Sequence, residues 1–296
     1  MALVAAGLSG VSLTMAAEPP FRSLAVGATP ESVVPGFDGK LYVTLMGTKR
    51  EKGDGDGKVV VVDGDKVTVF TEGLDDPKGI VFVGGKLITT DFDKLWAIDA
   101  KGTKTLLAGP ESFPARPRFL NDVVVEPGAK TILVTDMGDL PAMFDAKGAF
   151  WALDSEQAKN LAPHGRVYRV TLDGKISVAI DYQSENPNPN GVDALADGTI
   201  LTAEFFRGRL LAWKNGKWQT LSDDHRSADG IVHDNAGNFY VTEVRTGRVW
   251  QVKATGEKHL LATLQSAADL HLDETKHQLI VPDSKAGMLV FIPLAK

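Results

Sequence analysis

A pattern of two short apolar strands joined by a turn recurs six times along the chain. Its clearest copy opens at Asn190, continues through Val192 and an Asp197-Gly198 turn, and ends at Glu204. The other copies open at residues 31, 78, 121, 229 and 268. Most copies are about 40 residues apart, and a repeat of that length with room for four strands is typical of a propeller blade. The sequence therefore predicts an all-β fold, a six-bladed β-propeller with four antiparallel strands per blade.

The third copy is longer than the others, because it opens at residue 121 and the next copy opens only at residue 190. The extra length falls between a strand that ends near Asp136 and a strand over residues 166 to 170. Residues 138 to 164 are therefore interpreted as an insertion in this blade. Two interpretations of its role are open: a lid that presents Phe144, Phe150 and Trp151 to a substrate, or a loop packed on the rim.

The composition excludes several kinds of partner and site. The 296 residues carry a net charge of −6 and no long run of Lys or Arg, which disfavours nucleic acid and favours a small-molecule substrate or a cation. The chain has no cysteine, so disulfides, thiolate metal sites and a cysteine nucleophile are excluded. Since no linker or break in composition appears, residues 18 to 296 are expected to form one domain, whose oligomeric state the sequence does not indicate.

Residues 1 to 17 contain no charged side chain and end in small residues just before Glu18. They resemble the apolar part and cleavage region of a secretory signal, although the positively charged start of such a signal is missing. The segment is short and rich in Gly, Ser and Ala, which is not typical of a membrane span. We therefore expect a periplasmic or secreted protein with no membrane contact after signal removal, or a cytoplasmic protein if this segment is not a signal.

The residues that open the six copies are expected to share one end of the propeller, because the strands of a blade run alternately up and down. Four of them carry oxygen donors, two carboxylates and two amides. Such a set suits a hard cation, so Ca²⁺ is the predicted ligand, with Mg²⁺ or Mn²⁺ as substitutes and Zn²⁺ disfavoured. The alternative is that Asn and Asp before Gly are ordinary turn residues, which explains one such position more easily than four. The six positions are Glu31, Lys78, Asn121, Asn190, Asp229 and Ala268.

These motifs resemble the family of senescence marker protein 30 (regucalcin), gluconolactonase and the luciferin-regenerating enzyme. The resemblance covers about residues 24 to 294 through the repeat spacing. Its specific part is the set Pro30-Glu31, Asn121-Asp122, Pro189-Asn190-Gly191 and Asp229-Gly230. It implies a six-bladed propeller with one catalytic divalent metal in the tunnel, held by Glu31, Asn121, Asn190 and Asp229, and it implies that Asp229 is also the candidate general base.

Two further residues are candidate substrate-binding groups. Family members often carry an Arg two residues before the first Asn, whereas Arg118 here precedes Asn121 by three residues. We expect Arg118 near the mouth, the end of the propeller at which the six opening residues lie. Glu204 is the first choice among the acidic residues that end five of the second strands, for which capped turns and ion pairs are the alternative. Deeper in the tunnel, Asp193 and His271 are expected to form a hydrogen-bonded pair, to hold a buried water or to hold a second structural cation.

The predicted function is a Ca²⁺-dependent hydrolase of lactones, either sugar lactones or related esters, in which the metal polarises the carbonyl and an activated water attacks it. Asp229 acts through that water or as a direct nucleophile. Two alternatives stay open: a propeller that binds a metal or ligand without catalysis, and a phosphotriesterase like the related diisopropylfluorophosphatase propellers. The spacing of the histidines does not support a Ser-His-Asp triad.

Overall fold

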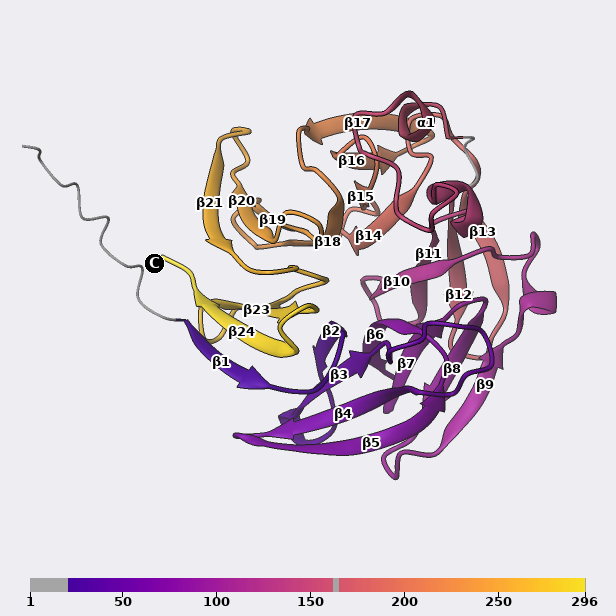
Figure 1. Ribbon diagram of the computed structural model, residues 1–296, viewed down its shortest axis with the longest axis vertical. Helices are drawn as coiled ribbons and strands as arrows, with labels where there is room; N and C mark the ends of the chain where they lie inside the picture. The colour runs from indigo at the N-terminus through magenta and orange to yellow at the C-terminus, as the bar shows by residue number, and fades with distance from the viewer. Residues whose placement is uncertain (1–20, 162–164, 296) are drawn as a thin grey trace, which may run out of the picture.

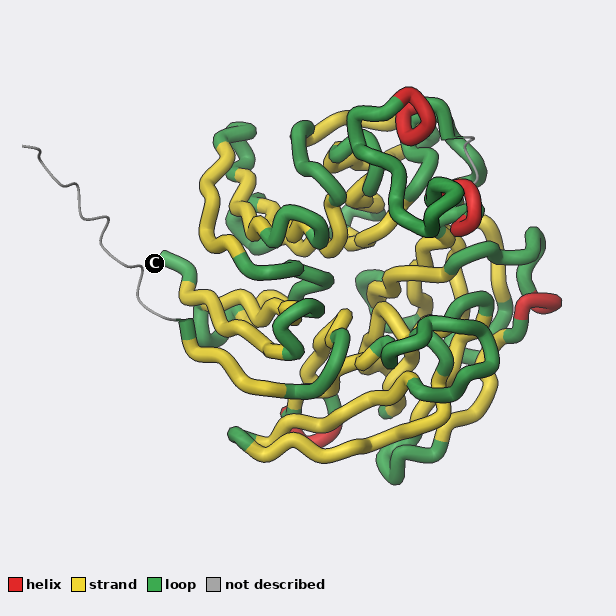
Figure 2. The backbone as a smooth tube through the Cα atoms, in the orientation of Figure 1, coloured by secondary structure: helices red, strands yellow, loops and turns green. Residues whose placement is uncertain are grey.

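The computed structural model describes residues 21–161 and 165–295. Their strands form six antiparallel sheets of four strands each, arranged as blades around a central axis, and helix is confined to a few short turns (Figures 1 and 2). The predicted six-bladed β-propeller is therefore confirmed. The expected signal, residues 1 to 17, lies outside the described residues. No helix in the described part of the chain has the length and hydropathy needed to cross a membrane.

Five blades take their strands from consecutive stretches of chain, with the first strand innermost and the fourth outermost. Blade one consists of β2 (Pro30–Pro35), β3 (Leu41–Leu45), β4 (Gly57–Asp63) and β5 (Lys66–Leu74), and blade two of β6 (Pro77–Val83), β7 (Lys86–Asp91), β8 (Lys94–Ile98) and β9 (Lys104–Ala108). Blade three consists of β10 (Leu120–Val125), β11 (Thr131–Asp136), β12 (Arg166–Thr171) and β13 (Ile176–Ile180). Blade four consists of β14 (Pro189–Ala194), β15 (Ile200–Glu204), β16 (Arg209–Lys214) and β17 (Lys217–Ser222), and blade five of β18 (Ala228–His233), β19 (Phe239–Glu243), β20 (Arg248–Val252) and β21 (Lys258–Thr263). The short helical turns are η1 (Phe37–Gly39), η2 (Pro110–Ser112), η3 (Leu140–Met143) and α1 (Glu156–Lys159).

The sixth blade combines strands from both ends of the described chain. It contains β22 (His271–Asp273), β23 (Gln278–Asp283) and β24 (Met288–Pro293), and its outermost strand is β1 (Arg22–Ala25). β1 pairs antiparallel with β24, with Arg22 opposite Phe291 and Ala25 opposite Met288. Backbone hydrogen bonds between the first and last strands therefore close the ring.

The hydrophobic core lies between adjacent blades. Alternation along a strand sends every second side chain to each face of the sheet, and in a propeller both faces meet a neighbouring blade. Ile88 of blade two packs in one buried cluster with Val123 and Tyr168 of blade three. Val43 of blade one packs in the same way with Ile280 of blade six. Each blade therefore depends on its neighbours for burial, and the ring is stable as a unit.

The predicted insertion is the long connection between β11 and β12, described here except for residues 162 to 164. It contains η3 and α1, and the hydroxyl of Ser155 caps α1 by accepting a hydrogen bond of 3.2 Å from the amide of Ala158. Its apolar side chains belong to one cluster with Phe119, Phe205 and Phe206. The insertion therefore packs against the loops of blades three and four, next to the end of the central tunnel.

Candidate functional site

The six residues that open the copies of the repeat line one cavity of about 630 Å³ at one end of the central tunnel. All six blades therefore contribute to it. Among the lining residues are the four predicted oxygen donors, Glu31, Asn121, Asn190 and Asp229, and all four are buried. The structure thus brings together the residues that the repeat placed at equivalent positions.

A β-bulge positions these side chains. On β2, Pro30 pairs with Leu45 and Val33 pairs with Val43, so the inner strand has one residue more than its partner between these points. The same register shift occurs at the start of β6, β10, β14 and β18. A bulge interrupts the strict alternation of a strand and re-aims the side chain it contains. The second residue of each of these inner strands lies within the bulge, and it therefore reaches the cavity instead of the packing between blades.

Buried threonines on the second strands hold the bulges in place. Thr135 Oγ1 accepts a hydrogen bond of 2.9 Å from the amide of Asp122 in its own blade and donates one of 2.7 Å to the carbonyl of Asn190 in the next blade. Thr44 makes the same two kinds of contact in blade one, the second of them to the carbonyl of Lys78 at 2.7 Å. These hydroxyl groups link the backbone at one site position to the backbone at the next, and so fix the spacing of the side chains.

Glu31 and Asp229 are buried carboxylates, and Glu31 is not fully hydrogen-bonded. The Oε2 atom of Glu31 has no hydrogen-bond partner among the described residues. Asp229 Oδ1 accepts a hydrogen bond of 2.6 Å from Nδ2 of Asn190. Burial raises the pKa of Glu31 well above its usual range, although the charge of Lys78 opposes this, and burial raises the pKa of Asp229 to about 7. Burial of two ionised carboxylates in one cavity is costly unless a positively charged group lies beside them.

The donor set fits a hard divalent cation. Carboxylate and amide oxygens are the ligands that Ca²⁺ prefers, and the unpartnered oxygen of Glu31 is a donor that a cation would satisfy. No three acidic or histidine side chains in the described part of the chain are arranged to hold a metal by themselves. The amides of Asn121 and Asn190 are therefore needed to complete the set. The Asn121 amide is available, since its oxygen accepts no hydrogen bond from the described residues and its Nδ2 lies 3.5 Å from the sulfur of Met137.

Two charged residues of the cavity have no role in the sequence prediction. Lys78 occupies one of the six site positions with its side chain only 8% exposed. Its Nζ lies 3.0 Å from the sulfur of Met46 and 3.6 Å from Oδ2 of Asp76. Asp76 is buried, lines the cavity, and has an Oδ1 atom without a partner among the described residues. Asp76 precedes the bulge at a position where the other blades carry no matching acid, so the repeat does not reveal it.

One wall of the cavity is apolar. Phe119 and Phe205 come from loops of blades three and four, and Phe144 and Phe150 come from the insertion. The rings of Phe144 and Phe150 stack with their centroids 4.5 Å apart, and the Phe150 ring lies 5.6 Å from that of Phe205. Met46, Met137 and Val244 complete this wall.

The insertion is held against blade five by one arginine. Nη1 of Arg245 donates a hydrogen bond of 3.1 Å to the carbonyl of Trp151, and its guanidinium lies 5.6 Å from the centre of the Phe150 ring. The indole of Trp151 donates to the carbonyl of Ala142 at 3.1 Å, within the insertion. Phe144 and Phe150 therefore face the cavity as expected, whereas the Trp151 indole braces the insertion itself.

The structure corrects the expected position of Arg118. Its Nη1 forms an ion pair of 2.8 Å with Oδ2 of Asp139, the side chain is 47% exposed, and it is not among the lining residues of the cavity. Its neighbour Phe119 lines the cavity instead. The one additional residue between Arg118 and Asn121 accounts for the change, since Phe119 now stands two residues before Asn121.

The structure also corrects the expected position of Glu204. Its side chain is fully buried, and its two carboxylate oxygens accept hydrogen bonds from the amides of Phe206 at 3.2 Å and Arg207 at 2.6 Å. Asp136 accepts amide hydrogen bonds at the same place in blade three. These acids cap the turns that follow the second strands, which is the alternative interpretation of the pattern.

A second layer of carboxylates lies one residue further into the tunnel. Asp122 Oδ2 accepts a hydrogen bond of 2.8 Å from the amide of Val192 in the next blade, and Asp269 accepts a short hydrogen bond from the hydroxyl of Ser32. A glycine leaves room for Asp269, because a Cβ atom on Gly230 would lie 2.3 Å from its Oδ1. Burial raises the pKa of Asp122 well above its usual range and that of Asp269 to about 6. These two acids tie adjacent inner strands together.

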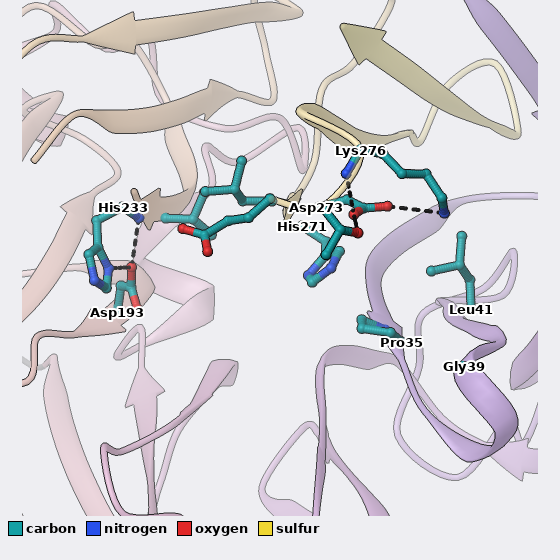
Figure 3. A pocket seen from close by; sticks show the side chains of 12 residues that line it. Pro35, Gly39, Leu41, Asp193, His233, His271, Asp273 and Lys276 are labelled. Atoms are coloured by element: carbon teal, nitrogen blue, oxygen red, sulfur yellow. Dashed lines mark hydrogen bonds and ion pairs between the residues drawn. The ribbon is translucent and has the colours of Figure 1, made fainter. Parts of the chain in front are cut away.

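The opposite end of the tunnel contains a different pair from the one predicted. Asp193 Oδ2 lies 2.6 Å from Nδ1 of His233 and accepts a hydrogen bond of 2.9 Å from the backbone amide of the same residue (Figure 3). His271 lies on the other side of the same cavity, of about 560 Å³, beside Asp273 (Figure 3). The predicted pairing of Asp193 with His271 is therefore wrong. Val232 is the residue of blade five that is equivalent to Asp193 in the repeat. Asp193 pairs with the next residue, His233, so a comparison of equivalent positions overlooks the contact.

The sequence matches no known family model and no curated protein. Among solved structures, the chain is similar to a putative gluconolactonase, with a TM-score of 0.66 and 16% identity over 95% of this chain and 96% of that one. It is similar to a gluconolactonase from Xanthomonas campestris, with a TM-score of 0.60 and 19% identity over 94% and 99% of the two chains. It is also similar to virginiamycin B lyase from Staphylococcus aureus, with a TM-score of 0.60 and 13% identity over 93% and 100%.

At these identities the likeness shows the fold alone. The gluconolactonases among the neighbours have the fold that the family resemblance implied. A lyase shares that fold, so the architecture does not by itself define the reaction. The chemistry must be argued from the residues of the cavity.

Proposed function

We propose that this chain is a divalent-metal-dependent hydrolase of lactones or related esters, with Ca²⁺ as the preferred ion. The observation that carries the proposal is the meeting of Glu31, Asn121, Asn190 and Asp229 in one cavity, with a buried oxygen of Glu31 that has no partner among the described residues. The gluconolactonases among the structural neighbours support this reaction class.

Glu31, Asn121, Asn190 and Asp229 would hold the ion. When bound, a divalent cation supplies electrophilic polarisation of the ester carbonyl. The other basic residues of the lining, Arg50, Arg245 and Lys285, are exposed. The charge of the buried part of the cavity supports the presence of a cation: three buried acids, Glu31, Asp76 and Asp229, line it with one buried base, Lys78. Their formal charge of −2 is the charge that a divalent cation balances.

Asp229 is the candidate general base. The hydrogen bond from Asn190 holds its carboxylate in one orientation within the cavity. In the proposed reaction Asp229 takes a proton from a water molecule while the water oxygen attacks the ester carbonyl, and it returns the proton to the departing oxygen when the carbon–oxygen bond breaks. Burial raises the pKa of Asp229 to about 7, and a divalent cation held beside it would lower that pKa, because positive charge favours the ionised carboxylate that accepts the proton.

The apolar wall serves the same reaction. Phe119 and Phe205 are buried, and with Phe144 and Phe150 they cover the side of the cavity next to the insertion. A substrate body placed against these rings displaces water from them, which strengthens electrostatic interactions at the reacting carbonyl.

Hydrolysis of a lactone panel by the full chain, followed in a pH-stat with Ca²⁺ and with a chelator, tests the proposal. The panel contains gluconolactone, dihydrocoumarin and simple alkyl lactones. Asp229→Asn is expected to lower kcat by roughly 100-fold or more, since general-base catalysis contributes about 10²–10⁴-fold. Glu111→Gln, which removes an exposed carboxylate on η2, is the matched control and is expected to leave activity unchanged.

Calorimetric titration of Ca²⁺ into chelator-stripped protein separates the proposal from its alternatives. One-site binding that weakens strongly in Glu31→Gln, together with turnover of any member of the panel, supports the hydrolase. Binding without turnover would point to a propeller that binds a metal without catalysis. If the wild-type chain does not bind Ca²⁺, Mg²⁺ or Mn²⁺, the metal-dependent hydrolase proposal is wrong.

A further inference from the structure

Lys78 carries a buried ammonium, and no oxygen acceptor of the described residues lies at normal hydrogen-bond distance from it. Its side chain is 8% exposed, its Nζ lies 3.6 Å from Asp76 Oδ2, and its nearest acceptor is the thioether of Met46 at 3.0 Å. The Phe119 ring lies 5.1 Å from Nζ. An ammonium has three donors, and sulfur is a weak acceptor. Asp76 pairs with the charge of this ammonium at 3.6 Å without reaching hydrogen-bond distance, so its donors remain available to a ligand in the cavity that Lys78 lines.

The position of Lys78 is fixed by the fold. It lies in the bulge at the start of β6, and Thr44 of blade one holds its backbone carbonyl with a hydrogen bond of 2.7 Å. Lys78 therefore occupies the same ring of positions as the four candidate metal ligands. Its place between the blade of Glu31 and the blade of Asn121 puts a positive charge beside the proposed reaction centre.

The surroundings of Lys78 define what kind of ligand would reach it. The Phe119 ring next to Nζ is continuous with the wall formed by Phe144, Phe150 and Phe205. A polyhydroxylated ligand such as a sugar lactone would leave the hydroxyl groups that face these rings without hydrogen-bond partners. A ligand with an apolar body and one anionic group matches both features, because the body covers the rings and the anion completes the contacts of the ammonium.

We propose that the substrate of this site is an ester or lactone with an aryl or alkyl body and a carboxylate group, and that Lys78 binds that carboxylate. The inference rests on the proposed hydrolase function and gives its substrate class. Lys78 is assigned to recognition, separately from the base Asp229 and from the residues that would hold the cation.

Ligand binding measured without turnover tests this inference independently of hydrolysis. The probes are 3-phenylpropionate, which carries a carboxylate and an aryl body, and 3-phenylpropan-1-ol, its neutral counterpart. Both are titrated calorimetrically into the full chain, once with saturating Ca²⁺ and once with a chelator. The wild-type chain is expected to bind the acid at least about tenfold more tightly than the alcohol, because only the acid can form a hydrogen bond between two charged groups with Lys78.

Lys78→Met keeps much of the length and apolar stem of the side chain and removes its charge. It is expected to weaken binding of 3-phenylpropionate by about tenfold or more and to leave 3-phenylpropan-1-ol within about twofold. Lys285→Met is the matched control, since Lys285 is an exposed lysine on the rim of the same cavity, and it is expected to change neither affinity by more than about twofold. Lys78→Arg keeps the charge and is expected to retain the preference for the acid.

Each contrary result overturns the inference. Equal affinity of the wild-type chain for the acid and the alcohol, or no binding of either, shows that the cavity does not select an anion with an apolar body, whether or not any variant folds. Unchanged acid binding in Lys78→Met, with a preference that disappears on chelation, assigns the carboxylate to the cation instead. Since none of these readouts requires hydrolysis, an inactive chain that still binds the acid through Lys78 contradicts the proposed function and leaves the recognition role standing.

Discussion

The hydroxyl of Thr135 connects the backbone of two neighbouring blades at the candidate site. It accepts a hydrogen bond from the amide of Asp122 in blade three and donates one to the carbonyl of Asn190 in blade four, with distances of 2.9 and 2.7 Å. The spacing between two of the candidate ligand positions, Asn121 and Asn190, therefore depends on a side chain that lies outside the cavity lining.

Replacement of this residue by valine is predicted to affect both stability and the site. Thr135→Val keeps the shape of the side chain and leaves a buried amide and a buried carbonyl each without this partner. We expect the free energy of unfolding to fall by about 1–3 kcal/mol in urea titrations and the affinity for Ca²⁺ to fall with it. Thr220→Val, at an exposed position of β17, is the control and is expected to change neither quantity. A Thr135→Val variant as stable as the wild type would show that the hydroxyl does not hold the blades.

The glycines of the inner strands are predicted to be strict packing requirements. A Cβ atom on Gly230 would lie 2.3 Å from Asp269 Oδ1 and 2.9 Å from its Cα, and the backbone cannot easily yield. We expect Gly230→Ala to lower the free energy of unfolding by about 1–3 kcal/mol or more. Gly109→Ala is the control, because the nearest atom to its Cβ would be 3.6 Å away and its φ of −94° suits alanine. Equal thermal stability of the two variants would contradict the close approach of these strands.

The contact between His233 and Asp193 predicts a pH-dependent contribution to stability. The hydrogen bond to Asp193 raises the pKa of His233 above its ordinary value of 6.5, so the folded chain binds this proton more tightly than the unfolded chain. The contribution is fully present below about pH 6.5 and is lost as the pH rises through the raised pKa of the folded state. Urea unfolding of the wild type and of Asp193→Asn at several pH values between about 5 and 9 measures it.

The Asp193→Asn variant is expected to lose part of the stability seen at low pH and to show a flatter dependence above about pH 6.5. His277→Asn is the control, since His277 is exposed and its φ of 48° is accessible to asparagine. The same pH dependence in the wild type and in Asp193→Asn would exclude this pair as its source.

Arg245 is predicted to hold the insertion in place while contributing little to the global stability of the fold. Arg245→Met removes the hydrogen bond to the Trp151 carbonyl and the contact with the Phe150 ring. We expect amide hydrogen exchange of residues 144 to 151 to become faster while global unfolding shifts by less than about 1 kcal/mol. Arg248→Met, which removes an exposed guanidinium 5.9 Å from the Trp250 ring, is the control. Unchanged exchange in the insertion would mean that its own packing holds it in place.

The ring of site residues could be predicted from the sequence because its geometry is tied to the backbone repeat. Glu31 and Asp229 lie at the same bulge in different blades, so equal positions in the repeat become equal positions around the axis. The threonines that fix those bulges were also present in the sequence as a repeated residue of the second strand. Their role requires knowledge of which backbone groups lie within hydrogen-bond distance in the next blade.

The substrate-binding predictions failed for a local reason. An acid at the end of a strand has the same sequence surroundings whether it faces a ligand or caps a turn. The amides of Phe206 and Arg207 decide the matter for Glu204, because they approach its carboxylate only once the turn has formed. Arg118 differs by a single residue of spacing, so Phe119 lies two residues before Asn121 and lines the cavity in its place.

The pairing of β1 with β24 sets the order in which the protein can be completed during its synthesis. Among the strands of the described residues, β1 emerges from the ribosome before the others, yet its partner β24 is made after all of them. Until β24 appears, Arg22 to Ala25 have no sheet to join, and blade one and blade six cannot meet across their shared cluster of Val43 and Ile280. The earlier blades can pack in sequence as they emerge. The cavity that brings Glu31 and Asp229 together is complete only when the last blade closes the ring. We therefore expect a ribosome-bound chain that stops before residue 288 not to bind the proposed cation.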